Sequence, residues 1–242
     1  MCVQFAHHGR AASFTVKGYV RELFTSIQGE GIYAGTRQTF VRFLGCNRAC
    51  NYCDTPDARI RTGAFEYNGQ QFDNPVAAEF IVPRITERAV SITGGEPLTQ
   101  PDFLLEVSKD CKALGKDVYL ETNGTVPDAL QQVIDYIDTI AIDFKIESAT
   151  GEKTPWDAHA QCLRIAAQKN VFVKITINQN VLSQEVATVC DIIKAVDKRI
   201  PLVIQPIVLK PIKPYVDMQK QALGWLPDVR IIPQIHKYLG LR

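Results

Sequence analysis

Three cysteines lie close together in the first quarter of the chain, at Cys46, Cys50 and Cys53, with the spacing C-x3-C-x2-C. Thiolates select soft metal centres such as zinc, copper(I) and iron–sulfur clusters. A structural zinc site takes four protein ligands, so a zinc ion here would need a fourth ligand from elsewhere. Three cysteines on a cubane cluster would instead leave one iron open for another molecule. A chance group of buried thiols is the third interpretation, and the spacing favours the cluster.

The segments before the cysteines indicate how they are positioned. Residues 38–44 read as a β-strand that stops at Gly45, so the cysteines should lie on a loop at its carboxyl end. A strand or extended arm over 18–25 comes earlier and leads into a loop over 26–31. Residues 56–88 are polar and broken by glycine and proline, with only a hint of a short helix over 75–80. The first crossover is therefore expected to be reduced.

From Ala89 onward, strands and helices alternate. Strands are predicted over 89–93, 117–121, 139–142, 171–177, 202–204 and 229–232. Helices are predicted near 101–114, 128–136, 157–168, 184–196 and 215–223. This alternation is typical of an α/β protein with a parallel sheet and right-handed crossovers.

Polar or glycine-rich residues follow the carboxyl ends of six predicted strands, the one over 38–44 included, at 45–55, 94–97, 122–124, 143–145, 178–180 and 205–206. In barrels and open α/β sheets that edge binds ligands. The candidate site residues are therefore expected to converge on one rim.

The whole-chain properties limit the possible classes. With 242 residues, 46% hydrophobic and 22% charged, the chain fits one large globular α/β domain. We assign residues 1–17 to a leader of unknown role and 18–242 to a single domain. A net charge of +1 gives no indication of nucleic-acid or anionic-membrane binding. No apolar run is long enough to span a membrane.

The seven cysteines and the N-terminus bear on the compartment. The cysteines are odd in number and scattered outside the trio, which argues against a secreted disulfide framework. Cys111, Cys162 and Cys190 are expected to be small core residues. The first ten residues lack the apolar core of a signal peptide. We therefore expect a cytoplasmic protein.

Arg42 stands out because it lies in an apolar strand, on the same predicted face as Phe40 and Leu44. An arginine there needs a carboxylate partner. That partner is either an internal acidic residue or a substrate carboxylate. The Gly-x-Gly loop that holds Gln28 and Glu30 is either an ordinary turn or a site for the edge of a flat heterocycle.

The other strand ends carry similar alternatives. Gly94-Gly95-Glu96-Pro97 could bind an ammonium group or simply turn the chain into a helix. Thr122 and Asn123 could bind hydroxyl groups, although Asn-Gly is also a common turn. Lys145 could pair with a ligand carboxylate or with Asp143. Gln205 could read the edge of an adenine ring.

Two further features are less specific. The hydroxyl of Thr55 would suit Mg2+ rather than a soft metal, but a turn or helix cap is the simpler interpretation from physics alone. The C-terminal residues 234–242 combine His236, basic residues and apolar residues. Tails of this composition can dock over a site, whereas most tails fray. His236 itself is more often a surface or capping histidine.

The cysteine spacing resembles the cluster motif of the radical S-adenosylmethionine (SAM) superfamily, and Gly94–Pro97 resembles its second motif. Residues 24–31, 40–47, 53–55, 93–97 and 236–240 together resemble the 7-carboxy-7-deazaguanine synthase family. The block through Thr55 is the specific part, and the matches extend from Phe24 nearly to the C-terminus. The resemblance implies a modified partial (β/α)6 barrel.

The family resemblance also implies a reaction and its cofactors. The family converts 6-carboxy-5,6,7,8-tetrahydropterin to 7-carboxy-7-deazaguanine with loss of ammonia, in queuosine biosynthesis. It uses a [4Fe–4S] cluster, SAM and Mg2+, and it is typically a homodimer. The reduced cluster transfers an electron to SAM, and the resulting 5′-deoxyadenosyl radical takes a hydrogen atom from the pterin. A flavodoxin-like or other reductant is the implied partner, with no nucleic acid and no membrane.

The resemblance assigns roles to residues of this chain. The cluster ligands are Cys46, Cys50 and Cys53, and the Mg2+ ligand is Thr55, which reverses the interpretation from physics alone. Substrate contacts are Ile27, Gln28, Gly29, Glu30, Arg42, Thr93, His236 and Arg242. SAM contacts are Tyr52, Asp54, Gly94, Gly95, Glu96, Thr122, Asn123, Asp143, Phe144, Lys145, Gln205, Pro206, Ile207 and Val208. No further catalytic side chain is assigned.

Two departures from the family pattern matter. The leader is longer than usual, and Asp143-Phe144 replaces a Ser-Pro pair that some members carry before the lysine. The closest alternative is a glycyl-radical-enzyme activating enzyme, which shares the cysteine loop and SAM but needs a protein partner. The other alternative is a non-catalytic iron–sulfur or zinc protein. The Gln28–Gly31 loop and the His236 segment argue against the activating enzyme. A non-catalytic protein would make the strand-end motifs Gly94–Pro97 and Thr122–Gly124 a coincidence.

Overall fold

The computed structural model describes residues 15–241, and a ten-stranded sheet forms the frame of this part of the chain. The strand order is β12-β11-β10-β9-β8-β7-β3-β2-β4-β5. All neighbours from β3 to β12 are parallel. The edges β5 and β12 do not pair with each other, so the sheet stays open. This arrangement confirms the predicted α/β class and partial barrel.

The strand bounds agree closely with the sequence prediction. The parallel strands are β3 Arg37–Phe43, β7 Ala89–Gly94, β8 Asp117–Thr122, β9 Thr139–Asp143, β10 Asn170–Ile177, β11 Leu202–Pro206 and β12 Val229–Ile231. Antiparallel to β3 lies β2, Val20–Ile27. Ser26 and Ile27 were expected in a loop, which is wrong, because they pair with Gln38 and Arg37 and extend β2 by two residues.

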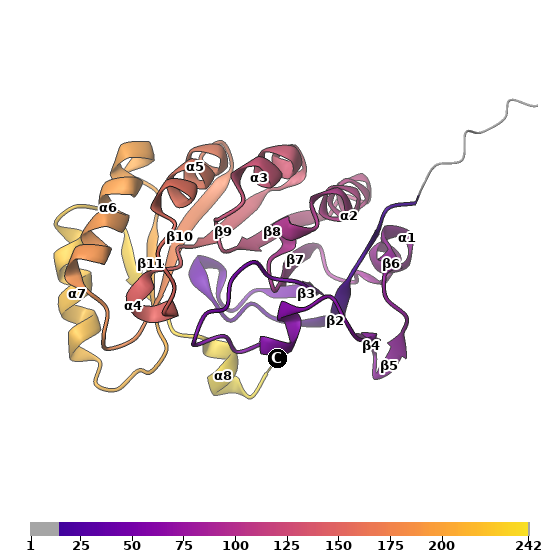
Figure 1. Ribbon diagram of the computed structural model, residues 1–242, viewed down its shortest axis with the longest axis horizontal. Helices are drawn as coiled ribbons and strands as arrows, with labels where there is room; N and C mark the ends of the chain where they lie inside the picture. Colours follow the sequence, from indigo (N-terminus) through magenta and orange to yellow (C-terminus); the bar gives the residue numbers. More distant parts are fainter. Residues whose placement is uncertain (1–14, 242) are drawn as a thin grey trace, which may run out of the picture.

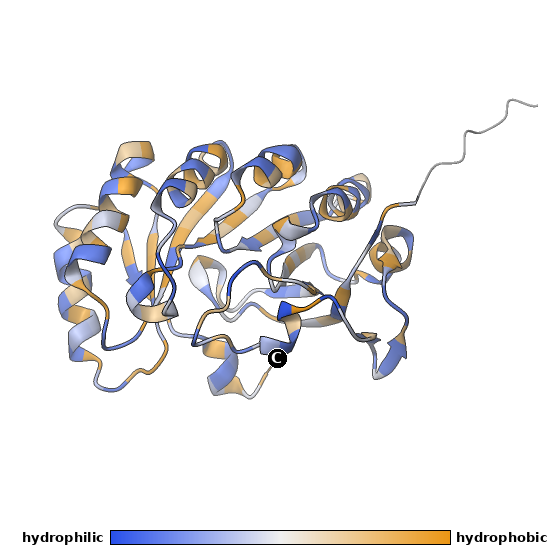
Figure 2. Ribbon diagram, in the orientation of Figure 1, coloured by the Kyte–Doolittle hydropathy of each residue, from blue (hydrophilic) through white to orange (hydrophobic). Residues whose placement is uncertain are grey.

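Helices follow the parallel strands and cover one side of the sheet (Figure 1). They are α2 Pro101–Ala113, α3 Pro127–Val133, α5 Trp156–Ala166, α6 Ser183–Asp197 and α7 Lys213–Leu223. The short α4, Glu147–Thr150, was not predicted, and α8, Ile235–Leu239, lies on the other side of the sheet. The outer helices carry hydrophilic residues toward solvent, and the strands between them are largely hydrophobic (Figure 2).

The first crossover is reduced, as predicted. Between β3 and β7 the chain forms only short elements, namely the 3-10 turn Pro56–Arg59, β4 Phe65–Tyr67, β5 Gln70–Phe72, β6 Val76–Ala77, α1 Ala78–Ile81 and the 3-10 turn Val82–Arg84. The two-residue β1, Lys17–Gly18, pairs with β6, so Lys17, which we had placed in the leader, takes part in the sheet structure. Residues 1–14 lie outside the described residues.

The sheet packs an apolar layer on each face. The main core lies between the sheet and the outer helices, and Cys111, Cys162 and Cys190 are fully buried in it, as predicted. A smaller cluster on the inner face contains Tyr119, Ala141, Phe172 and Val203.

Polar residues follow this inner cluster along the strands. Because side chains alternate between the two faces of a strand, the residue two positions later points inward again. Those residues are Glu121, Asp143, Lys174 and Gln205, and all of them line one cavity. The inner face therefore changes from apolar to polar toward the carboxyl ends of the strands.

No helix among residues 15–241 is long and apolar enough to cross a membrane.

Gln100 attaches the N-terminal arm to the end of β3. Its amide accepts a hydrogen bond from the backbone of Tyr19 at 2.8 Å, and it donates to the carbonyls of Tyr19 and Leu44 at 3.0 and 2.8 Å. Replacing it with leucine keeps the volume but leaves these groups without partners. We expect Gln100→Leu to lower the free energy of unfolding by about 2–3 kcal/mol, measured by urea denaturation.

Gln132 on α3 is the matched control, because it is exposed and makes one bond, to Asp102. Gln132→Leu should change stability by less than about 0.5 kcal/mol. Equal stability of the two variants would contradict the role given to Gln100.

Candidate active site

A cavity of about 550 Å3 opens at the carboxyl ends of the parallel strands. The loop after β3, the ends of β7 to β11 and the C-terminal segment all contribute to its wall. This confirms that polar strand ends gather on one rim, which is the place where α/β sheets bind ligands.

The cysteine loop is fixed to the protein at both ends. Gly45 donates to the Ala58 carbonyl at 2.8 Å and Cys46 donates to the Arg59 carbonyl at 3.0 Å. Farther along, the backbone of Ala49 donates to Glu152, which also pairs with Arg48. All three cysteines of the motif line the cavity. Burial raises the pKa of the Cys46 and Cys50 thiols, so a metal centre would have to stabilise their thiolate forms.

The donor set fits a cluster better than a single ion. Within residues 15–241, no three or more His, Cys, Asp or Glu side chains converge closely enough to hold one metal ion. A structural zinc site requires such convergence. A cubane cluster binds each cysteine to a different iron, so the sulfurs can stand farther apart.

Two glycines at the end of β7 allow it to approach this loop. A Cβ on Gly94, whose φ is +137°, would lie 2.2 Å from the Phe43 carbonyl oxygen, and one on Gly95 would lie 2.3 Å from the Gly45 carbonyl oxygen. Any side chain at either position would push the loop away. The glycine pair therefore has a packing reason that does not depend on a ligand.

Glu96 uses its carboxylate inside the protein. It is fully buried and accepts from the backbone of Leu98 at 3.0 Å, from the Thr122 hydroxyl at 2.8 Å and from the backbone of Asn123 at 2.6 Å. Burial raises the pKa of this carboxyl to about 7, although these three donors favour its charged form. The predicted contact with the SAM ammonium stays a prediction, and the bonds seen here join the ends of β7 and β8.

A chain of charged groups crosses the floor of the cavity. Lys145 contacts Asp143 at 2.8 Å and the Tyr52 hydroxyl at 3.1 Å. Lys174 on β10 pairs with Glu30 and lies 3.4 Å from Asp143. Burial alone would raise the pKa of Glu30, but the Lys174 ammonium and hydrogen bonds from Lys174 and Gln234 lower it to about 2. Of the two partners predicted for Lys145, a ligand carboxylate and Asp143, the structure shows the pair with Asp143. Lys145 also lines the cavity, where it could reach a ligand carboxylate.

The loop that follows β2, over 28–30, meets the inner face of the sheet. Gln28 donates to Glu121 on β8 at 2.9 Å, and Thr93 donates to the other oxygen of Glu121 at 2.9 Å. Two predicted substrate contacts therefore share one acidic residue, which the sequence interpretation had not included.

Arg42 pairs with an acidic residue of the protein and also lines the cavity. Its Nε lies 2.8 Å from Glu22 on β2, and its side chain is 18% exposed. Phe24 and Phe40 stack beside it with centroids 5.1 Å apart. Arg42 therefore forms an internal ion pair and also lines the cavity, so both alternatives raised for it, an internal partner and a substrate carboxylate, agree with the structure.

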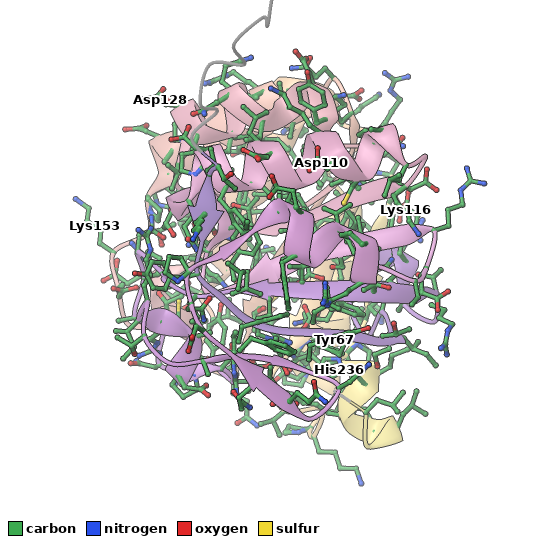
Figure 3. All side chains as sticks on the ribbon, turned by 90° about the vertical axis from the view of Figure 1, so that its right-hand side faces the viewer. Tyr67, Asp110, Lys116, Asp128, Lys153 and His236 are labelled. Atoms are coloured by element: carbon green, nitrogen blue, oxygen red, sulfur yellow. The ribbon has the colours of Figure 1, made fainter. Side chains whose placement is uncertain are left out.

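The C-terminal segment docks beside the loop that follows β2. The backbone of Ile235 donates to the Gly29 carbonyl at 2.9 Å, and Gln234 donates to Glu30 at 2.6 Å. His236 packs so closely on Gly29 that a Cβ there would lie 1.9 Å from its Nδ1. Figure 3 shows His236 where α8 meets the protein, at the opposite end of the view from Asp110 and Asp128 in the helical layer.

Most predicted site residues line the cavity. They are Ile27, Gln28, Gly29, Glu30, Arg42, Cys46, Cys50, Tyr52, Cys53, Asp54, Thr55, Thr93, Gly94, Gly95, Glu96, Thr122, Asn123, Asp143, Lys145, Gln205, Ile207 and His236.

Three of the predicted residues that the structure describes are not brought there. Phe144 is fully buried against His159, and neither Pro206 nor the exposed Val208 lines the cavity. Arg242 lies outside the described residues.

Sequence interpretation missed several lining residues. They are Arg21, Glu22, Phe24, Phe40, Arg48, Asp57, Glu66, Glu121, Ala141, Lys174, Thr176, Gln234, Lys237 and Leu241. For Glu121 and Lys174 a signal existed, because each lies two positions after an inward apolar residue on its strand. For Arg21 and Glu66 no comparable signal exists, since their approach depends on the irregular first crossover.

The burial of Glu96 leads to a stability prediction. Because burial raises the pKa of Glu96 to about 7, the folded protein favours the protonated carboxyl. This group should therefore lower the free energy of unfolding by about 2–4 kcal/mol as the pH rises from 4.5 to above 7. Glu96→Gln should remove that fall, measured by urea denaturation at both ends of this range, whereas Glu106→Gln, at a half-buried position on α2, should keep it. The same pH dependence in Glu96→Gln as in the wild type would contradict the raised pKa of this carboxyl.

Comparison with known proteins supports one family. Residues 40–185 match the family model of the radical SAM superfamily. The chain is 37% identical to the 7-carboxy-7-deazaguanine synthase of Geobacter sulfurreducens, over 91% of this chain and 96% of that protein. It is 36% identical to the enzyme of the same name from Archaeoglobus fulgidus, over 91% and 97%.

Solved structures show the same fold at lower identity. The crystal structure of QueE from Escherichia coli matches with a TM-score of 0.59 and 19% identity, over 88% of this chain and 92% of that one. The structure of TYW1 with a lysine-pyruvate adduct bound matches with a TM-score of 0.52 and 14% identity, over 78% and 73%.

Taken with the cysteine loop in its strand-end cavity, these similarities establish that the chain belongs to the radical SAM superfamily and, within it, to the 7-carboxy-7-deazaguanine synthase family.

Proposed function

We propose that this protein converts 6-carboxy-5,6,7,8-tetrahydropterin to 7-carboxy-7-deazaguanine with loss of ammonia, as a step of queuosine biosynthesis. The observation that carries the proposal is the 37% identity with a synthase of that name over 91% of this chain. The geometry supports it, because the cysteine loop and the predicted substrate contacts face one cavity. We also propose that residues 18–242 form one radical SAM domain.

The cofactors follow from the superfamily and suit the residues present. Cys46, Cys50 and Cys53 would hold the [4Fe–4S] cluster, and the strand ends beside them would hold SAM. When bound, these two groups supply one-electron chemistry that removes a hydrogen atom from the substrate, while the protein binds, orients and shields the reactants. An electron donor is required, and we propose a flavodoxin-like protein.

The substrate side of the cavity has groups of the right kinds. The Arg42 guanidinium would bind the pterin carboxylate with charge-assisted hydrogen bonds. Gln28 and Glu30 offer amide and carboxylate groups to the polar edge of the ring, and the Phe24–Phe40 stack gives an apolar surface beside it. His236 would close the site from the C-terminal side.

Thr55 suits the proposed Mg2+ role. It precedes the 3-10 turn at Pro56 but makes no side-chain capping hydrogen bond there, and it lines the cavity. A free hydroxyl oxygen beside substrate oxygens is the type of ligand that Mg2+ accepts. We propose a homodimer as well, which sedimentation of the purified protein would test.

Anaerobic turnover tests the function directly. The protein is reconstituted with iron and sulfide and supplied with dithionite, SAM, Mg2+ and 6-carboxytetrahydropterin, and the products are followed by mass spectrometry. We expect 7-carboxy-7-deazaguanine and methionine. Cys50→Ala should lose cluster absorbance and activity, whereas Cys190→Ala, buried in the core on α6, should keep both. SAM cleavage without the deazaguanine product would favour an activating enzyme instead.

Arg42→Ala tests the substrate side. Loss of charge-assisted bonds to the pterin carboxylate should raise the KM for the pterin about 10- to 100-fold, with cluster absorbance retained. Arg37→Ala is the control, since Arg37 lies on the same strand, pairs with Glu87 and does not line the cavity. Equal pterin affinity in Arg42→Ala and the wild type would show that Arg42 does not bind the pterin carboxylate.

A further inference from the structure

A buried histidine joins two of the strand ends that form the cavity. His159 on α5 has no exposed surface and does not line the cavity. Its ring nitrogens bond one backbone group from each of two loops, the one after β8 and the one after β9. Nothing in the family motifs or in the proposed chemistry uses this residue.

The two hydrogen bonds define the state of the imidazole. Nδ1 lies 3.0 Å from the Gly124 carbonyl oxygen, which can only accept, so Nδ1 carries the proton. Nε2 lies 3.0 Å from the Lys145 backbone nitrogen, which can only donate, so Nε2 must be unprotonated. One neutral tautomer satisfies both loops. Burial lowers the pKa of His159 to about 4, which keeps that neutral form near neutral pH.

The ring is fixed in place by packing. Phe144 stacks on it with centroids 4.4 Å apart and planes 8° apart. Gly124 has φ +66°, and a Cβ there would lie 3.2 Å from Nδ1 and 2.5 Å from Ile142. The loop after β8 therefore fits tightly between His159 and β9.

Both loops carry predicted SAM contacts immediately next to the bonded groups. Asn123 precedes Gly124, and its backbone is bonded to Glu96. Lys145 donates its backbone N–H to His159, while its ammonium reaches Asp143 and the Tyr52 hydroxyl of the cysteine loop. A shift of either loop would move these side chains within the cavity.

We propose that His159 is a positioning residue that sets the separation of the β8 and β9 strand ends and thereby holds Asn123 and Lys145 in place for SAM. This inference rests on the proposed function for the identity of the ligand. His159 itself would not touch the ligand, because it is fully buried and does not line the cavity.

Substitutions at His159 distinguish positioning from packing. His159→Phe keeps a flat ring but removes both bonds, whereas His159→Gln keeps one donor and one acceptor on a longer side chain. In the reconstituted enzyme we expect His159→Phe to raise the KM and Kd for SAM about tenfold, with the KM for the pterin changed less than about twofold. His159→Gln should recover to within about threefold of the wild type.

Leu163→Ala is the matched control, because Leu163 is fully buried on the same helix. This variant should lower the melting temperature and leave the KM for SAM unchanged. The proposal is overturned if His159→Phe binds SAM like the wild type. It is also overturned if Leu163→Ala weakens SAM binding as much as His159→Phe does. Should His159→Phe fail to fold, His159→Asn replaces it, because its shorter side chain cannot reach both loops. The affinity of His159→Asn for SAM should be lower than that of His159→Gln. Wild-type affinity for SAM in His159→Asn would overturn the proposal.

Equilibrium dialysis of SAM without pterin separates this inference from the proposed function. Wild-type protein that binds SAM but makes no deazaguanine would refute the function and leave the His159 comparison intact. Wild-type turnover with unaltered SAM affinity in His159→Phe would refute only the role of His159.

Discussion

The site depends on the pairing of charges on the inner face of the sheet. Lys174 is only 8% exposed, and an isolated ammonium at such a position would be costly. Burial alone would lower its pKa, but Glu30 and Asp143 raise it, so it stays charged. Because Glu30 belongs to the predicted substrate loop and Asp143 to a predicted SAM segment, satisfying this one lysine brings the two halves of the cavity together.

The sequence was sufficient to predict the parallel sheet and most of the residues at its carboxyl edge that line the cavity. Alternating strands and helices gave the parallel sheet, the broken stretch over 56–88 gave the reduced crossover, and strand-end motifs gave most of the lining. The internal bonds of Glu96 and the choice of Glu22 as the internal partner of Arg42 were not predictable, because they depend on which groups the fold places opposite each other. The same holds for His159, which lies near the start of α5 with no motif around it.

The residues of the Gly94–Pro97 motif have structural roles in the protein that do not require a ligand. Gly94 and Gly95 are required by the approach of β7 to the backbone at Phe43 and Gly45, and Glu96 is required by three donors nearby. Each residue of this motif thus has a structural task in the protein alone. Binding a cofactor adds to these tasks, since the same contacts hold the cysteine loop against the end of β8.

The ion pair between Lys174 and Glu30 also bears on the position of the C-terminal segment. Helix α8 buries none of its residues, so apolar burial contributes little to its attachment. Its ion pair between Lys237 and Asp54 spans 3.4 Å with both side chains about half exposed, and such surface pairs contribute little. What remains are the backbone bond to Gly29 and the bonds from Gln234 to Glu30 and Asp54. Since Lys174 fixes the Glu30 carboxylate, the buried lysine contributes through Gln234 to holding His236 over the cavity.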